Sequence, residues 1–258
     1  MRLIFVRHAE PDYKNDSLTE KGFREAGLLA KRAAAWPVDA IYISPLGRAQ
    51  ATAAPTLEAL GMKGETCPWM QEYSALPVDE NGLPGRAWDL PAPQWTADCR
   101  MLDAQHWPES QIFARSITFE GQPPFMFYET PSPVECTGNA CLGQSRRVWD
   151  GIDGILAKNG YRRSGLYYKV EASNEKTLVF FAHLGVIDVM LGHVLNIAAP
   201  ILWHGFFLPP SSITVLSSEE REGTAFFRAQ TYGDTAHLYA AGEPVSHMGC
   251  YSTDVFTL

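Results

Sequence analysis

The chain has 258 residues, of which 46% are hydrophobic, so it can form one large α/β domain or two small ones. Its 29 Asp and Glu residues outnumber its 21 Lys and Arg residues, which gives a net charge of −8. This acidic balance argues against nonspecific binding to nucleic acid or to anionic membranes, because both depend on basic surface.

The N-terminal residues and the cysteines indicate a compartment. No signal-peptide pattern precedes the first apolar segment, and no apolar run approaches the ~18 residues that a membrane helix needs. The cysteines are odd in number and irregularly spaced, which does not suggest a disulfide framework; they are Cys67, Cys99, Cys136, Cys141 and Cys250. Cys136 and Cys141 are near enough for a local pair or a metal clip, but no zinc pattern is completed around them. We expect a cytoplasmic protein with free thiols.

The first predicted strand, residues 3–6, is apolar on both faces and runs directly into Arg7 and His8. Such a run is typical of a buried central strand. In open α/β sheets, ligands bind just outside the carboxyl ends of the strands. Arg7 and His8 are therefore either a phosphate-binding cation beside a nucleophilic imidazole or a surface pair in a strand-to-loop turn.

The next segments alternate between helical and extended patterns. Thr19 is a predicted N-cap for a helix over 23–33, and strand 39–44 is followed by a helix over 49–60. A third strand is predicted over 65–70. This alternation predicts an α/β fold, a three-layer α/β/α sandwich with a mostly parallel central sheet.

The pattern changes between residues 73 and 143, which are rich in Pro, Gly, Trp and Phe and show little periodicity. Structureless segments of this length are uncommon in compact domains and are usually functional. We predict an inserted cap or lid over 73–143, with an α/β core formed by 1–72 and 144–258. Its aromatic residues either form a small core of their own or line an apolar wall for an organic phosphate or a partner. They are Tyr73, Trp88, Trp95, Trp107, Phe113, Phe119, Phe125, Phe127 and Tyr128.

Regular elements return behind the insert. We predict helices over 145–159 and 186–195, and strands over 166–170, 177–182, 211–216 and 224–230. The first two of these strands are expected to form a hairpin. The strand over 177–182 repeats the opening pattern, because it is fully apolar and ends in His183.

Three strand ends therefore carry chemistry that can converge at one edge of the sheet. Arg7 and His8 follow the first strand, Arg48 comes shortly after the second, and His183 follows the strand over 177–182. Guanidinium groups match phosphate oxygens bidentately. A histidine can accept a phosphoryl group, which divides one difficult displacement into two easier ones.

These segments resemble the histidine phosphatase (phosphoglycerate-mutase-like) superfamily. The resemblance is carried by Arg7-His8-Ala9-Glu10, by residues 18–22 (LTEKG), by residues 44–53 (SPLGRAQATA) and by Ala182-His183. It covers roughly residues 2–60 well and 144–238 loosely, and it does not cover the insert. The resemblance implies that His8 is phosphorylated, that Arg7, Arg48 and His183 hold the phosphoryl oxygens, and that no metal or other cofactor takes part.

The resemblance also implies a general acid, and Glu72, just after the third strand, fits this role. The alternative is that Glu72 is an ordinary solvated residue, and Glu10, Asp12 and Asp188 are less favoured substitutes. The nucleophilic nitrogen of His8 must be unprotonated, so we expect a backbone carbonyl to accept a hydrogen bond from the other ring nitrogen.

Two further features of the resemblance concern the surroundings of the pocket. Ser44 either supports the pocket geometry or caps the turn before Pro45. The family usually has a Gly directly after the second His, whereas here Leu184 separates His183 from Gly185, so the pocket backbone is expected to differ. The residues after Glu72 also lack the pattern of the mutases.

We therefore expect a metal-independent, histidine acid phosphatase-like hydrolase with a small-molecule phosphomonoester as substrate and with no nucleic-acid or membrane partner. Two alternatives stay open: a mutase-like phosphotransferase, and a non-catalytic module that binds a phospho-ligand or a protein. The sequence does not name the substrate or the oligomeric state.

Overall fold

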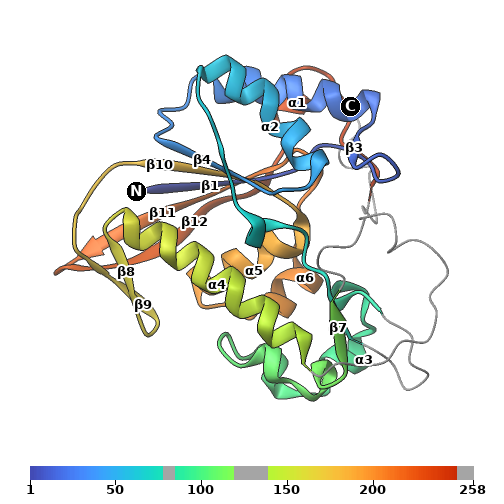
Figure 1. The fold of residues 1–258 in the computed structure, drawn as a ribbon, viewed down its shortest axis with the longest axis vertical. Helices are drawn as coiled ribbons and strands as arrows, with labels where there is room; N and C mark the ends of the chain where they lie inside the picture. The colour runs from blue at the N-terminus through green and yellow to red at the C-terminus, as the bar shows by residue number, and fades with distance from the viewer. Residues whose placement is uncertain (78–84, 119–138, 249–258) are drawn as a thin grey trace.

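A computed structural model describes residues 1–77, 85–118 and 139–248, with one large sheet at the centre (Figure 1). The strands of this sheet are β1 (Arg2–Arg7), β4 (Ala40–Ile43), β5 (Glu65–Thr66), β8 (Tyr161–Ser164), β9 (Tyr167–Val170), β10 (Thr177–Ala182), β11 (Ile213–Arg221) and β12 (Thr224–Asp234). Their order across the sheet is β5-β4-β10-β1-β11-β12-β9-β8. Two small antiparallel pairs lie outside it: β2 (Pro11–Asp12) with β3 (Ser17–Leu18), and β6 (Ala75–Pro77) with β7 (Ser116–Thr118).

Helices cover both faces of the sheet, which confirms the expected three layers. The longer helices are α1 (Glu20–Ala33), α2 (Gly47–Leu60), α4 (Ala140–Lys158), α5 (Leu184–Leu195) and α6 (Ala199–Gly205). The short ones are α3 (Ala92–Trp95), α7 (Ala236–Tyr239) and the 3₁₀ turns η1 (Pro68–Met70), η2 (Ala87–Asp89), η3 (Cys99–Leu102), η4 (Trp107–Glu109) and η5 (Gln111–Phe113). Helices α1 and α2 lie on one face, and α4, α5 and α6 lie on the other (Figure 1). Among the described residues, no helix is long and apolar enough to span a bilayer.

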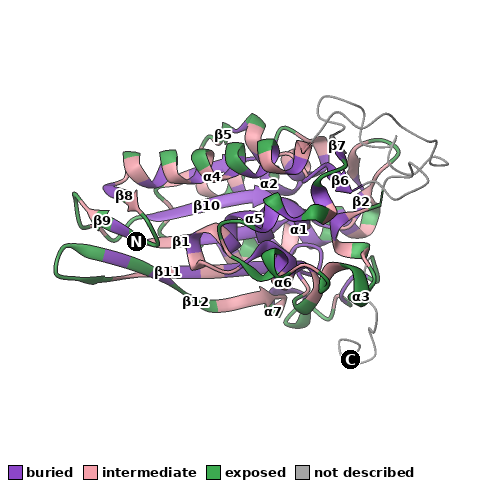
Figure 2. Cartoon of the chain, turned by 90° about the horizontal axis from the view of Figure 1, so that it is seen from below, coloured by how far each residue is buried: buried purple, intermediate pink, exposed green. Residues whose placement is uncertain are grey.

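The sheet is parallel in one half and antiparallel in the other. Strands β5, β4, β10 and β1 run parallel, and β11, β12, β9 and β8 extend the sheet in antiparallel pairs. Of the parallel strands, β1 and β4 are mostly buried and the short edge strand β5 is exposed. Strand β10 is buried along its whole length (Figure 2). Arg7 pairs with Ala182, so His8 and His183 leave neighbouring strands at the same level.

The sheet differs from the prediction in three respects. The predicted hairpin between 166–170 and 177–182 is wrong, because β9 pairs with β8 and β12 whereas β10 pairs with β1 and β4. Strand β8 was not predicted, because its two arginines suit an exposed edge more than a buried strand. The third strand ends at Thr66, since Pro68 starts a 3₁₀ turn and cannot donate to a ladder.

The described part of the insert shares the main core. Tyr73, Trp107 and Phe113 are fully buried in the same hydrophobic cluster as residues of α4, α5 and α6. These aromatic residues therefore form packed core, but as part of the main cluster and not as the small core of their own that one interpretation expected. Phe119, Phe125, Phe127 and Tyr128 lie outside the described residues, as do Cys136 and Cys250, and the division into a core and a cap stays a prediction. The described cysteines Cys67, Cys99 and Cys141 are free thiols.

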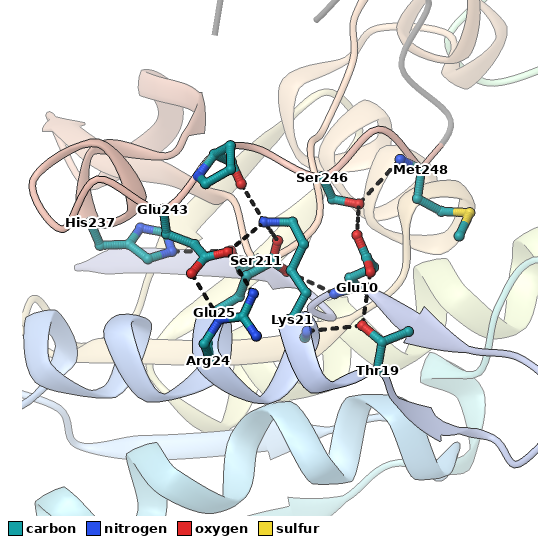
Figure 3. A network of polar contacts seen from close by, with 12 residues as sticks. Glu10, Thr19, Lys21, Arg24, Glu25, Ser211, His237, Glu243, Ser246 and Met248 are labelled. Atoms are coloured by element: carbon teal, nitrogen blue, oxygen red, sulfur yellow. Dashed lines mark hydrogen bonds and ion pairs between the residues drawn. The ribbon is translucent and has the colours of Figure 1, made fainter. Parts of the chain in front are cut away.

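A polar network holds the loop after His8 against helix α1 (Figure 3). The Glu10 carboxylate accepts hydrogen bonds from Thr19 Oγ1 at 2.8 Å and from Ser246 Oγ at 2.6 Å. The Glu10 backbone N–H donates to Glu25 Oε2 at 2.8 Å. Glu25 is fully buried, and Lys21 Nζ lies 3.2 Å from its other carboxylate oxygen. The network therefore joins the C-terminal described segment, α1 and the loop that carries the predicted nucleophile.

Candidate active site

His8 lies directly after the buried strand β1 and is 1% exposed. Its Nδ1 is 2.8 Å from the carbonyl oxygen of Ala9, so the expected backbone carbonyl is present. A donated Nδ1–H leaves the lone pair on Nε2, which is the form that a nucleophile needs. Burial, followed by the positive charges of Arg48 and Arg7, keeps the pKa of His8 well below its usual value, so the ring is neutral near pH 7.

His183 lies beside His8, with 5.1 Å between the two ring centroids. It follows β10 and is the N-cap residue of α5, and it is completely buried. Its Nε2 is 2.7 Å from Ser44 Oγ, so Ser44 contacts the pocket directly. Its Nδ1 has no hydrogen-bond partner in the described part of the chain. Burial and the nearby Arg48 charge also hold the pKa of His183 well below its ordinary value.

Arg7 is 6% exposed and is held mainly by backbone. Its guanidinium donates to the carbonyl oxygen of Leu208 and lies 5.7 Å from the ring centre of Phe207. Its Nε has no partner among the described residues. A buried guanidinium with unused donors is suited to receive an anion, because an unmet donor costs free energy until a ligand occupies it.

Arg48 comes from the first turn of α2 and is 3% exposed. Its Nη1 lies 2.7 Å from Asp16 Oδ1, while the other oxygen of Asp16 accepts the Gly47 backbone N–H at 2.6 Å. The guanidinium also lies 5.5 Å from the ring centre of Tyr13. The sequence reasoning missed Asp16 and Tyr13. A carboxylate in a loop can stabilise a helix N-terminus, and this was the feature of the sequence that could have pointed to Asp16. No local pattern predicts its contact with Arg48, because the two residues are 32 positions apart.

Glu72 follows η1 and comes to the edge of this pocket. Its Oε1 accepts backbone N–H bonds from Tyr73 at 2.8 Å and from Val186 at 3.2 Å. Burial raises the pKa of Glu72, against the opposing effect of Arg48 and of these N–H groups. A carboxyl group with a raised pKa keeps its proton to higher pH than usual, which favours a role as general acid.

The other acidic residues considered from the sequence are engaged elsewhere. Glu10 is held by the network on α1, and Asp12 accepts a 2.6 Å hydrogen bond from Asn15. Asp188 is buried on α5 and accepts a 2.7 Å hydrogen bond from Tyr232; burial raises its pKa to about 8. Among the titratable candidates, Glu72 alone contacts the backbone that follows His183 in the described structure.

The four side chains Arg7, His8, Arg48 and His183 are called the phosphate pocket below. They combine two guanidinium groups, one lone pair and one partnerless imidazole nitrogen, which suits a tetrahedral dianion. In the described ranges, no three His, Cys, Asp or Glu residues are grouped so that they could hold a metal ion.

Comparison with known proteins agrees with this geometry. Residues 3–109 match the model of the histidine phosphatase superfamily, branch 1. The resemblance that the sequence motifs indicated is therefore confirmed over residues 3–109. No curated protein matches the chain.

Solved structures share the histidine phosphatase fold across almost the whole chain. One is a mycobacterial glucosyl-3-phosphoglycerate phosphatase in complex with VO3, at 17% identity and a TM-score of 0.54, covering 91% of this chain and 99% of that one. Another is a phosphoserine phosphatase from Entamoeba histolytica in complex with 3-phosphoglyceric acid, at 17% identity and a TM-score of 0.56, covering 92% and 98%. At this identity the likeness establishes the fold alone.

Proposed function

We propose that this protein is a phosphatase that hydrolyses a small-molecule phosphomonoester through a phosphohistidine intermediate on His8. The observation that carries the proposal is the state of His8, whose Nδ1 contacts the Ala9 carbonyl and whose Nε2 lone pair is free for attack. The cations Arg7 and Arg48 act on this imidazole electrostatically. The named activities of the phosphatases with the same fold support the same reaction class.

In the first step, the Nε2 lone pair of His8 forms a bond to phosphorus while the bond from phosphorus to the leaving oxygen breaks. Glu72 gives its proton to that oxygen, so the alcohol leaves neutral. Arg7, Arg48 and His183 stabilise the charge on the three equatorial oxygens. In the second step, water attacks phosphorus, its proton returns to Glu72, and phosphate leaves His8.

The two pKa shifts define an expected pH dependence. His8 must be neutral, and its lowered pKa makes this form available well into acidic solution. Glu72 must be protonated, and its raised pKa keeps the acid form to higher pH than usual. Activity should therefore be highest between the two pKa values, in the acidic to neutral range, which is the behaviour of a histidine acid phosphatase-like enzyme.

The proposal is tested by hydrolysis of p-nitrophenyl phosphate in the presence of EDTA. The wild-type protein should turn over and yield a phosphorylated protein on rapid acid-free quenching, with the label on histidine. His8→Ala should abolish both signals. His106→Ala is the matched control, because this histidine is 55% exposed on its side chain and pairs with Asp103 on the surface.

Each alternative outcome has a distinct meaning. Hydrolysis that survives His8→Ala would exclude the phosphohistidine route, and hydrolysis lost in EDTA would exclude a metal-independent one. A wild-type protein that keeps its phosphate and passes it to an added alcohol would be a phosphotransferase. Phosphate binding without any labelling would indicate a non-catalytic module.

A further inference from the structure

Three groups from different parts of the chain crowd around Gly185, two positions after His183. A Cβ built on this glycine would lie 2.5 Å from Trp88 Cζ3 and 2.9 Å from Glu72 Oε1. Trp203 Nε1 donates a 3.1 Å hydrogen bond to the Gly185 carbonyl oxygen. Real Cβ atoms do not approach so closely, so glycine lets the Trp88 ring and the Glu72 carboxylate lie on the same piece of backbone.

Trp88 differs from the insert aromatics that form core. Tyr73, Trp107 and Phe113 are at most 1% exposed, whereas Trp88, on η2, is only partly buried. One side of its indole packs against Trp203, edge to face, with 6.1 Å between the ring centroids. Trp88 is therefore held by the core through Trp203, while part of its indole ring stays exposed to solvent beside Glu72.

The hydrogen bonds of Glu72 show how its carboxyl group lies beside the phosphate pocket. Both hydrogen bonds of its carboxylate to described residues use Oε1, so Oε2 is the oxygen available to a leaving group. The charges that act on Glu72 are those of Arg48 and Arg7, which belong to the phosphate pocket. The carboxyl group of Glu72 thus lies close both to the cations of the phosphate pocket and to the piece of backbone at Gly185 that the indole of Trp88 contacts.

We propose that Trp88 lines the leaving-group subsite and selects phosphomonoesters of alcohols with an aromatic or other flat apolar face. This inference rests on the proposed phosphatase function and names the substrate class. A ring packed against an indole is stabilised beyond the area that it buries, because the two aromatic rings also attract each other electrostatically. Such apolar surface with a few oriented polar groups is how small-molecule sites usually discriminate.

The test compares benzyl phosphate with ethyl phosphate, whose alcohols have similar acidity and differ in the ring. The wild-type protein should prefer the benzyl ester in kcat/KM by about tenfold, which corresponds to about 1.4 kcal/mol. Trp88→Ala should remove most of this preference, mainly through KM, and Trp88→Phe should restore it. Trp95→Ala is the control, because Trp95 is an insert tryptophan that stacks on His204 at 4.4 Å, whereas the three atoms nearest to a Cβ at Gly185 belong to Trp88 and Glu72.

Inhibition by inorganic phosphate is measured for every variant, because phosphate reports on the pocket without a leaving group. An unchanged inhibition constant in Trp88→Ala with a lost benzyl preference supports the subsite. Equal losses for both esters, or weaker inhibition by phosphate, would assign Trp88 a structural role and overturn the proposal. A wild-type protein that hydrolyses neither ester would contradict the phosphatase function itself, and the subsite with it.

A second experiment tests the contact between Trp88 and Gly185. Gly185→Ala should lower kcat/KM for both esters by about tenfold or more, because the new methyl group collides with Trp88 and Glu72. In the Trp88→Ala background, the same substitution should cost less, since one of the two collisions is gone. An equal cost in both backgrounds would show that Trp88 does not lie on Gly185 and would overturn the proposal.

Discussion

The four side chains of the phosphate pocket are at most 6% exposed, whereas Glu72 and Trp88 on the leaving-group side are only partly buried. The pocket is built from strand ends and helix starts of the α/β core. The leaving-group side is built from a 3₁₀ turn and from the insert. Under the proposed function, the phosphoryl group common to all substrates would be bound by the α/β core, and the variable part of the substrate would meet a separately supplied surface.

The two sides also differ in how their charges are balanced. Arg48 has a carboxylate partner in Asp16, while Arg7 contacts a backbone carbonyl group and an aromatic ring and forms no ion pair within the described residues. The pocket therefore holds a buried guanidinium group without a paired carboxylate among those residues. Such oriented charge stabilises a phosphoryl group without reorganisation during the reaction.

The largest expected effect is the loss of a pocket cation. Arg48→Ala should lower kcat/KM for p-nitrophenyl phosphate by about 10³, the upper range for removing one preorganised donor. Arg48→Lys should recover only part of the activity, because an ammonium lacks the planar fork. Arg162→Ala, which breaks a surface pair with Glu171, is the control. Full activity in Arg48→Lys would show that charge alone suffices.

The next effect separates the two sides of the site. Glu72→Gln should slow ethyl phosphate by about 10² and p-nitrophenyl phosphate by less than about tenfold, because p-nitrophenolate needs no proton to leave. The fall in activity as pH rises through the raised pKa of Glu72 should also disappear in this variant. Steady-state kinetics of both esters across pH measure this. Equal slowing of the two esters would remove Glu72 from the acid role.

A smaller effect on catalysis is expected from Asp16, which supports the pocket residue Arg48. Asp16→Ala should raise KM by about tenfold for every ester, because hydrogen bonds to a charged group contribute about 1.5–3 kcal/mol and Arg48 loses its support. The benzyl-to-ethyl ratio should not change. Asp12→Ala, in the same loop but bonded to Asn15, is the control. A changed ratio would show that the two sides of the site are coupled.

The smallest effect concerns stability and leaves the site intact. Burial raises the pKa of Glu25 from 4.5 to about 7, so the folded protein binds more protons than the unfolded chain in that window. The free energy of unfolding should therefore fall as pH rises from 4.5 to 7, by up to about 3 kcal/mol from this residue. Urea titrations of Glu25→Gln should show a flatter pH dependence than the wild type. Glu20→Gln, exposed on the same helix, should match the wild type.

The parts of the site that the sequence predicted are those encoded locally. The apolar run before Arg7-His8, the N-cap Thr19 and the apolar strand before His183 each predict their own element, and parallel pairing then brings the strand ends together. The helix expected over 49–60 starts two residues earlier, at Gly47, which places Arg48 in its first turn. A few short motifs were therefore enough to predict that these side chains lie together, while their binding of phosphate stays a prediction.

The parts that were missed depend on contacts across long separations. Asp16 itself has a left-handed backbone conformation, with φ 45°, and its side chain contacts Arg48. The periodicity of the sequence does not predict such a turn. The contact between Trp88 and Gly185 was also missed, because the insert that carries Trp88 shows no periodicity from which its structure could be predicted. The wrong hairpin has the same origin, because neighbouring strands in sequence were paired, whereas β9 joins the far antiparallel edge and β10 the centre.

The hydrogen bond between Ser44 and His183 bears on what His183 can offer a ligand. Ser44 Oγ accepts the backbone N–H of Leu46 at 3.3 Å and lies 2.7 Å from His183 Nε2, and its second lone pair leaves both directions of the bond to His183 open. When the hydroxyl donates, the ring proton of His183 lies on the partnerless Nδ1, so this neutral ring offers a proton where His8 offers an electron pair. An anion at Nδ1 would select that form, and Ser44→Ala would remove the hydroxyl group that holds it.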